Sequence, residues 1–304
     1  MINVLLIRVV RTLLTLLGVL VLAFALGRLS GDPAALLMPL EATEADIEQA
    51  RRQLGLDRPL PEQFVLYTAD ILRGDFGRSI AQGRPALEVV LGRAPASIRL
   101  GLYSFIVAVV LGVPAGMLAA YQRNKLADQL LMSLSLAAQS LPSFFMGITL
   151  ILIFSVQLGW TPAFGDDTWR HYLLPIFTLS VYSLAIIIRL TRSSLLEVLN
   201  QDYVRTARAK GLPETRVRNV HTLRNALIPV VTVLGLQLGS IISGAAVIET
   251  VFAWPGMGAL AVTAVNQRDF PVIQTIVLLS AFAFAFFNFA VDLLYVWLDP
   301  RVRL

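Results

Sequence analysis

Long uncharged apolar stretches alternate with short charged segments along the whole chain. Seven stretches contain no Asp, Glu, Lys or Arg: 12–27, 100–122, 129–165, 171–188, 225–248, 250–267 and 270–291. A helix needs about 20 apolar residues to cross the ~30 Å hydrocarbon core of a bilayer. The pattern therefore predicts membrane-spanning helices.

Two of the seven stretches change the number of predicted spans. Stretch 129–165 is too long for one span, and its last part, Gly159-Trp160-Thr161-Pro162, is typical of an exit into the membrane interface. Stretch 250–267 contains Trp254-Pro255-Gly256-Met257-Gly258, where Pro255 disrupts a helix. We interpret residues 250–270 as an outer re-entrant loop. Six spans remain, which predicts an all-α polytopic membrane fold.

The composition agrees with a lipid environment. Of 304 residues, 56% are hydrophobic and only 15% are charged, whereas soluble domains carry roughly 25% charged residues. Arg8 and Arg11 followed by an apolar run also resemble a signal peptide, but Gly27-Arg28-Leu29 replaces the expected small-x-small cleavage site. We therefore expect a retained first helix. The chain has no cysteine, so neither a disulfide nor a thiolate metal site is expected.

The basic residues predict the orientation in the membrane. If both termini are cytoplasmic, the inside segments hold 14 of the 25 basic residues and the short outside loops hold two. Cytoplasmic loops carry such an excess of Lys and Arg. We thus expect a multi-pass membrane protein with cytoplasmic N- and C-termini. The net charge of +5 requires no nucleic-acid partner.

The spans divide the chain into three regions. Residues 1–29 form the N-terminus and first span, and 30–98 form an extracytoplasmic helical segment. Residues 99–304 form the core, which includes a cytoplasmic loop at 191–228 and the re-entrant loop at 250–270.

Short helices are predicted in the extracytoplasmic segment. Thr43 and Asp46 form a capping pattern for the first helix. Pro61 can begin a second helix, and Pro85 a third that runs through Leu91. The segment is either a cap over the membrane domain or a docking surface for an extracytoplasmic partner, and the sequence leaves both open.

The cytoplasmic loop contains a short interrupted helix. Asp202 is a favourable N-cap for a two-turn helix over Tyr203–Lys210, Gly211 supplies the left-handed C′ position, and a helix restarts at Pro213. A helix this short does not fold alone, and its charges exclude it from lipid. Something must therefore pack against it.

This loop resembles that of ABC importer permeases. The resemblance rests on Asp202-Tyr203-Val204-Arg205-Thr206-Ala207-Arg208-Ala209-Lys210-Gly211-Leu212 and on Leu223-Arg224-Asn225-Ala226-Leu227-Ile228-Pro229. Further matches are Gly74-Asp75-Phe76-Gly77-Arg78-Ser79, the segment from Gly244 to Gly258, and Asp299-Pro300-Arg301-Val302-Arg303. Nearly the full length resembles the first permease subunit of dipeptide, oligopeptide, nickel and glutathione importers. Arg205 and Thr206 replace the Glu-Ala of the general loop pattern, a departure usual in the peptide branch.

The resemblance implies the fold, function and partners. The fold would be that of a type I ABC importer permease forming half of a pore in the bacterial cytoplasmic (inner) membrane. The function would be ATP-driven import of dipeptides or oligopeptides, with nickel or glutathione as alternative substrates. Expected partners are a second homologous permease, two ATPase subunits and an extracytoplasmic substrate-binding protein. ATP and Mg would bind to the ATPases and no cofactor to this chain. The residues implied in ATPase coupling are Asp202, Tyr203, Val204, Arg205, Thr206, Ala207, Arg208, Ala209, Lys210, Gly211, Leu212 and Pro213.

Other classes of function find less support. A P-loop requires Gly-Lys-Ser/Thr, and neither Lys125 nor Lys210 lies in such a motif. A stand-alone secondary transporter usually shows inverted repeats and charged midplane residues, which the sequence lacks. A non-transporting scaffold would leave the interrupted cytoplasmic helix unexplained. We therefore expect no enzymatic activity in this chain.

A few residues within spans are candidates for the transport pathway or gate. They are Gln139, Ser140, Pro142, Gln237 and Glu249. For Glu249, at the outer end of the fifth span, interfacial pairing or helix capping is the favoured interpretation. Small residues at four-residue spacing, Gly112 and Gly116, allow close helix approach, either inside the subunit or between subunits.

Overall fold

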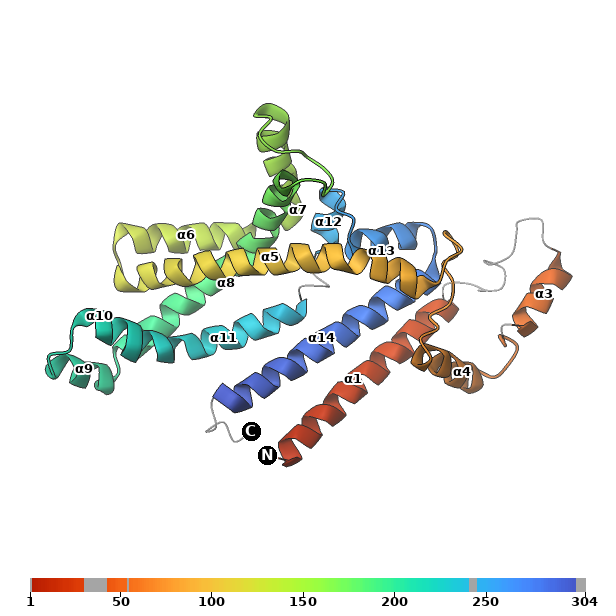
Figure 1. The fold of residues 1–304 in the computed structure, drawn as a ribbon, viewed down its shortest axis with the longest axis horizontal. Coiled ribbons are helices and arrows are strands. Elements are labelled where there is room, and N and C mark those ends of the chain that lie inside the picture. Colours follow the sequence, from red (N-terminus) through yellow and green to blue (C-terminus); the bar gives the residue numbers. More distant parts are fainter. Residues whose placement is uncertain (1, 30–42, 54, 241–244, 299–304) are drawn as a thin grey trace.

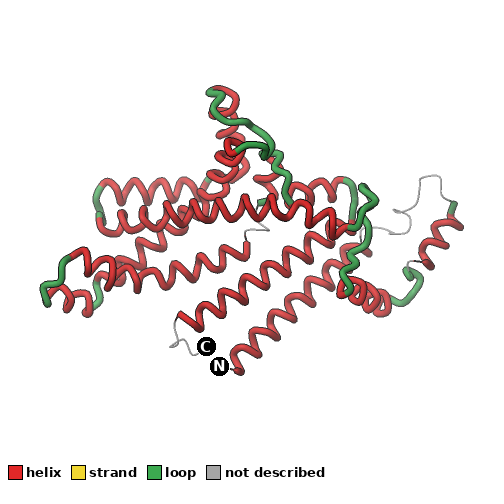
Figure 2. The backbone as a smooth tube through the Cα atoms, in the orientation of Figure 1, coloured by secondary structure: helices red, strands yellow, loops and turns green. Residues whose placement is uncertain are grey.

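Nearly all of the described chain is helical (Figures 1 and 2). The computed structural model describes residues 2–29, 43–53, 55–240 and 245–298. In chain order the helices are α1 (Ile2–Leu29), α3 (Glu44–Gln53), α4 (Leu60–Leu72), α5 (Ala86–Tyr121), α6 (Leu126–Ser140), α7 (Ser143–Leu150), the π-helix η1 (Ile151–Gln157), α8 (Trp169–Leu199), α9 (Asp202–Ala209), α10 (Glu214–Arg216), the π-helix η2 (Val217–Thr222), α11 (Leu223–Ser240), α12 (Ala246–Val251), α13 (Met257–Asn266) and α14 (Phe270–Leu298).

Helices α5 and α8 form the centre of the molecule. They pack more extensively than any other pair, with α6 and α11 also against α8 and with α14 between α11 and α1. Gly112 and Gly116 permit this approach. A Cβ on Gly112 would lie 2.8 Å from the side chain of Ile187, and one on Gly116 would lie 2.6 Å from Cβ of Thr191. These glycines therefore serve packing inside the subunit, one of the two predicted uses.

Six segments correspond to the six predicted spans. Four helices are long and apolar enough to cross a membrane: α1, α5, α8 and α14. A fifth span is possible if α6 and the α7–η1 unit count as one broken span. The predicted fifth span is covered by α11, a shorter apolar helix, and residues 241–244 at its end lie outside the described residues.

The third predicted span is broken in its middle. Its two parts meet at a bend of 102°, at Leu141 and Pro142. Proline disfavours the helical conformation of the preceding residue, and Leu141 is extended, with φ −89° and ψ 128°. Pro142 then becomes the N-cap of α7. At the far end, Gly159 adopts φ +64° and Trp160 is exposed, in agreement with the predicted interfacial exit.

The outer segment follows the predicted helix starts with one exception. The Thr43–Asp46 capping pattern is present, since the main-chain N–H of Thr43 donates to Asp46 Oδ2 at 2.9 Å and that of Asp46 to Thr43 Oγ1 at 3.3 Å. The prediction of a separate third helix from Pro85 through Leu91 is wrong. Pro85 is instead the N-cap of α5, which continues past Pro95 to Tyr121 and crosses the predicted region boundary at 98–99.

Buried Asp269 connects the outer loop after α4 to the start of α14. Its carboxylate accepts hydrogen bonds from Ser79 Oγ at 2.5 Å and from the main-chain N–H groups of Ile80 and Ala81 at 3.1 and 3.2 Å. Phe76, from the same loop, packs against the cluster formed by α5, α13 and α14. In Figure 1 this outer end lies opposite the end that carries α9 and α10.

Candidate functional site

The predicted two-turn helix is α9, and its ends are set by local geometry. Gln201 is the N-cap, so the prediction of Asp202 as N-cap is wrong by one residue. Asp202 is instead the first helical residue, where its negative charge interacts favourably with the positive end of the helix dipole. Gly211 has φ +72°, as predicted for the C′ position. The following N–H of Leu212 donates to the carbonyl of Ala207 at 3.3 Å and closes the helix.

The apolar face of α9 is covered by the chain itself. Val204 and Ala207 are buried against Val217 of η2 and contact Val198 and Leu212. The expectation that something must pack against this helix is therefore met within the chain, by η2. Sequence spacing could not show the contact with Val217, because the turn at residues 210–213 must first fold back.

Polar contacts hold the same unit together on its surface. Arg208 donates from Nε and Nη2 to the two carboxylate oxygens of Glu214, at 3.2 and 2.8 Å. This hydrogen-bonded pairing lowers the pKa of Glu214 and raises the pKa of Arg208. Asn225 Nδ2 donates to the hydroxyl of Tyr203 at 3.1 Å and links α9 to α11.

The opposite side of the α9 segment is open to a partner. The predicted coupling residues divide accordingly. Val204 and Ala207 are buried and Leu212 is half-buried, whereas the others are exposed: Asp202, Tyr203, Arg205, Thr206, Arg208, Ala209, Lys210, Gly211 and Pro213. The exposed set combines cationic side chains with the small side chains of Thr206 and Ala209, where another surface can come close.

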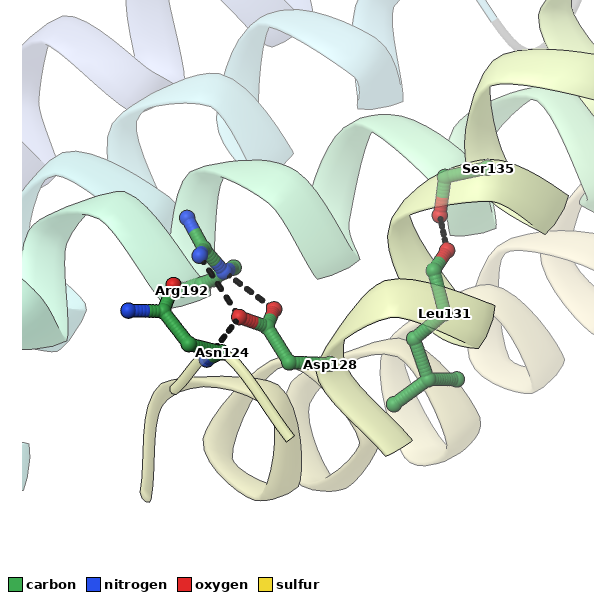
Figure 3. Close-up of polar contacts among 5 residues, drawn as sticks. All are labelled: Asn124, Asp128, Leu131, Ser135 and Arg192. Carbon is green, nitrogen blue, oxygen red and sulfur yellow. Dashed lines mark hydrogen bonds and ion pairs between the residues drawn. The ribbon is translucent and has the colours of Figure 1, made fainter. Parts of the chain in front are cut away.

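An ion pair between a buried carboxylate and a partly exposed arginine lies near this end of the molecule (Figure 3). Arg192 of α8 donates from Nε and Nη2 to the carboxylate oxygens of Asp128 at the start of α6, at 2.5 and 2.7 Å. The N–H of Asn124 donates to Asp128 Oδ2 at 2.9 Å. Two parallel N–H···O bonds give such a pair a fixed geometry. It fastens the turn between α5 and α6 to the helix that leads into α9.

A cavity of about 430 Å³ lies between α5, α6, α7, α8 and α11. Three of the predicted pathway candidates line it: Gln139, Pro142 and Gln237. Ser140 is exposed and does not belong to the lining. The other polar groups in its wall are Ser104, Ser143, Thr178, Tyr182 and Ser183. Among the described residues that line it, the cavity therefore offers hydroxyl and amide groups and no charged side chain.

Glu249, the remaining pathway candidate, lies in a separate buried site. Its carboxylate accepts hydrogen bonds from Ser97 Oγ at 2.6 Å and from the N–H groups of Gly258 and Ala259 at 2.7 and 3.0 Å. These N–H groups belong to the first turn of α13, so Glu249 caps that helix, as the favoured interpretation expected. Its carboxylate occupies the position where a Cβ of Gly256 would lie.

Comparison with known protein families gives two matches that together cover most of the chain. Residues 112–304 match the binding-protein-dependent transport system inner membrane component. Residues 1–101 match the N-terminal part of binding-protein-dependent transport system membrane components. The chain belongs to this family of ABC importer permeases. As a permease it is a transport component of the inner membrane and not an enzyme.

Relatives and solved structures agree with this assignment. The permease is 46% identical over 275 residues to the glutathione transport system permease protein GsiC of Escherichia coli strain K12, covering 90% of each chain. The corresponding protein of Salmonella paratyphi A is 46% identical over 304 residues, covering 100% of this chain and 99% of the relative. The fold is that of a chain in inward-facing structures of the MetNI methionine ABC transporter, with a TM-score of 0.57 at 18% identity over 69% of this chain and 96% of that one.

Sequence reasoning missed two features of the permease. Asp128 is the only acidic residue between Glu88 and Asp166, and this isolation beside a span was a usable signal for a buried partner. The role of Ser97, which joins Glu249 to the N–H of Met257, had no comparable signal because serine is common in helices. The matching segment 299–303 lies outside the described residues.

Proposed function

We propose that this permease forms half of the pore of an ATP-driven importer for short peptides, with glutathione as the best-supported substrate. Its identity of 46% to glutathione permeases over essentially the whole chain carries the proposal. Glutathione is itself a short peptide, so it fits the dipeptide and oligopeptide expectation better than the nickel alternative.

The partners follow from the type of importer. A second homologous permease completes the pore, two ATPase subunits bind ATP and Mg, and an extracytoplasmic binding protein delivers the substrate. Both termini of this chain lie in the cytoplasm. The exposed surface of α9 then faces an ATPase subunit.

The packing of α9 suggests how motion reaches the membrane. Val204 and Ala207 attach α9 to η2, which continues into α11, and Val198 belongs to α8. A displacement of α9 by the ATPase is therefore transferred to two membrane helices through a packed core. Interiors at close-packed density transmit such displacements because they compress little.

Two neighbouring alanines test the coupling role. Ala209 is exposed and Ala207 is buried. In the reconstituted importer, Ala209→Leu should leave the thermal stability of the permease unchanged and lower uptake per ATP hydrolysed at least tenfold. Ala207→Leu should instead lower thermal stability, because an added isobutyl group overpacks the contact with Val217, typically by about 1–3 kcal/mol. Normal uptake by the Ala209→Leu importer would contradict the coupling surface.

A competition experiment tests the substrate. Uptake of labelled glutathione into proteoliposomes that contain the complete importer should be saturable and inhibited by unlabelled glutathione more strongly than by a dipeptide or a nickel chelate. Stronger competition by the dipeptide or the nickel chelate would show that glutathione is not the preferred substrate. The assignment of the chain as a permease would be unaffected.

A further inference from the structure

We propose that the cavity between α5, α6, α7, α8 and α11 is a binding site for the carboxylate end of the transported peptide, with Arg189 as its charge partner. This inference deepens the proposed function, on which it rests for the chemical class of the substrate. Three independent features of the described residues support it.

The first feature is the size and chemistry of the cavity. Its volume of about 430 Å³ lies within the roughly 300–1,000 Å³ of typical small-molecule sites. Apolar walls from Phe105 and Met146 alternate with hydroxyl and amide groups such as Tyr182 and Gln237. Such walls suit peptide amide groups, which both donate and accept hydrogen bonds.

The second feature is an arginine that donates a hydrogen bond to a residue of the cavity wall and has no acidic partner among the described residues. Arg189 Nη2 donates to Gln139 Oε1 at 2.7 Å, and Gln139 lines the cavity. One turn further along α8, Arg192 is neutralised by Asp128. In the part of the chain that the structure describes, no carboxylate forms an ion pair with Arg189. A guanidinium group recognises carboxylates well because its planar fork matches their geometry.

Gln139 itself has an unused hydrogen-bond donor. Its Oε1 accepts from Arg189, while its Nε2 is buried and has no hydrogen-bond partner among the described residues. Buried polar atoms are nearly always satisfied by protein, water or ligand. A bound carboxylate or peptide carbonyl would supply the missing acceptor.

The third feature is the break between α6 and α7. Pro142 and Ser143, at the N-terminus of α7, line the cavity, and no side chain caps this N-terminus. The first N–H groups of a helix lack acceptors within it and attract anions. Broken membrane helices commonly present such half-helix N-termini to anionic substrate groups. The uncapped N-terminus of α7 thus favours binding of a carboxylate, as Arg189 does.

Arg189 also has a purely structural interpretation, as one of the basic residues that mark the cytoplasmic side of a span. A structural anchor and a substrate ligand differ in one measurable property. Only the ligand distinguishes a substrate with free carboxylates from the same molecule with esterified carboxylates.

Ligand binding to the complete importer tests the proposal. The importer, purified without its binding protein and without ATP, is titrated with glutathione and with glutathione dimethyl ester, and tryptophan fluorescence or calorimetry reports binding. The wild type should bind glutathione at least tenfold more tightly than the ester. Arg189→Gln should weaken glutathione binding at least tenfold without changing ester binding, and Arg189→Lys should retain part of the preference. Arg170→Gln removes a charge from the same helix away from the cavity, and it should change the affinity for neither glutathione nor the ester.

Several results would overturn the site. For the wild type, they are equal affinity for glutathione and its ester, or no binding of either ligand at millimolar concentration. For Arg189→Gln, they are wild-type affinity for glutathione, or an equal loss of affinity for both ligands. If the uptake competition identifies another peptide as substrate, that peptide and its C-terminal amide replace the two ligands. In that case the proposal of glutathione as substrate is refuted. The proposal of a carboxylate site is still tested, by comparing the affinities for the free and the amidated peptide.

Discussion

At the scale of single residues, two buried carboxylates hold in place the end of the permease that lies opposite α9. Glu249 holds the first turn of α13 next to Ser97 of α5. Asp269 holds the outer loop that contains Ser79 against the start of α14. Each carboxylate accepts hydrogen bonds from O–H and N–H donors of segments that are distant in the sequence or in the turn that follows. Glu249 therefore positions the start of a helix, and Asp269 positions a loop with little regular structure of its own.

Replacing Glu249 with glutamine should destabilise the permease. Glutamine offers one acceptor oxygen, so either Ser97 or the N–H groups of Gly258 and Ala259 lose their acceptor. A buried donor without an acceptor costs about 1–3 kcal/mol. Thermal unfolding of the purified permease should show the loss, while Glu197→Gln at an exposed site of α8 should stay within about 0.5 kcal/mol of the wild type. Unchanged stability of Glu249→Gln would show that the carboxylate is not needed for the loop.

At the scale of helices, close packing and helix breaks have different causes. Helices α5 and α8 approach closely because Gly112 and Gly116 leave room for Ile187 and Thr191. Helix α6 ends because Pro142 forces Leu141 out of the helical conformation. The first effect depends on two surfaces meeting, and the second on neighbouring residues alone.

Two glycines of α5 provide a matched test of the helix contact. Gly116→Ala places a Cβ 2.7 Å from the carbonyl oxygen of Ile188, which should destabilise the permease by about 1–3 kcal/mol. At exposed Gly92 a Cβ would meet no atom within 4 Å, so Gly92→Ala should stabilise the helix by up to about 1 kcal/mol. Thermal unfolding of both variants gives the comparison. Equal shifts in the unfolding temperature of the two variants would mean that the α5–α8 contact accommodates the added Cβ without loss of stability.

At the scale of the whole molecule, the α9 segment and the segments held by Glu249 and Asp269 lie at opposite ends of the helices. Figure 1 places α9 and α10 at one end of the α5–α8 pair and α4 and α13 at the other. The proposed carboxylate site lies between them, where α6 and α7 meet. In the proposed orientation, the substrate would enter at the end that carries α4 and α13, and the driving motion at the end that carries α9.

The absence of cysteine from the sequence allows a direct test of the proposed orientation. Exposed positions at the two ends can each receive a single thiol, as Gln82→Cys in the outer loop and Lys210→Cys after α9. A membrane-impermeant maleimide should label the Gln82→Cys permease in intact cells and the Lys210→Cys permease only after permeabilisation. The cysteine-free chain is the background control. The reverse labelling pattern would invert the proposed topology.

The sequence alone determined the features that depend on neighbouring residues and on lipid as a solvent. Apolar segment lengths and the placement of arginines predicted the helical membrane fold. Gly211 and the Thr43–Asp46 pair predicted helix ends, and the loop motif predicted the permease family. These features are local because capping, proline geometry and transfer into lipid act on short segments.

Only the tertiary structure decided which residues meet across long separations. Burial of the α9 face on Val217, the pairing of Asp128 with Arg192, and the grouping of Gln139, Pro142 and Gln237 around one cavity required the helices to be packed first. The separation of Glu249 from that cavity has the same origin. A polar residue in an apolar span can cap a helix, pair with a charge or bind a substrate. The neighbours that distinguish these roles come from helices distant in the chain.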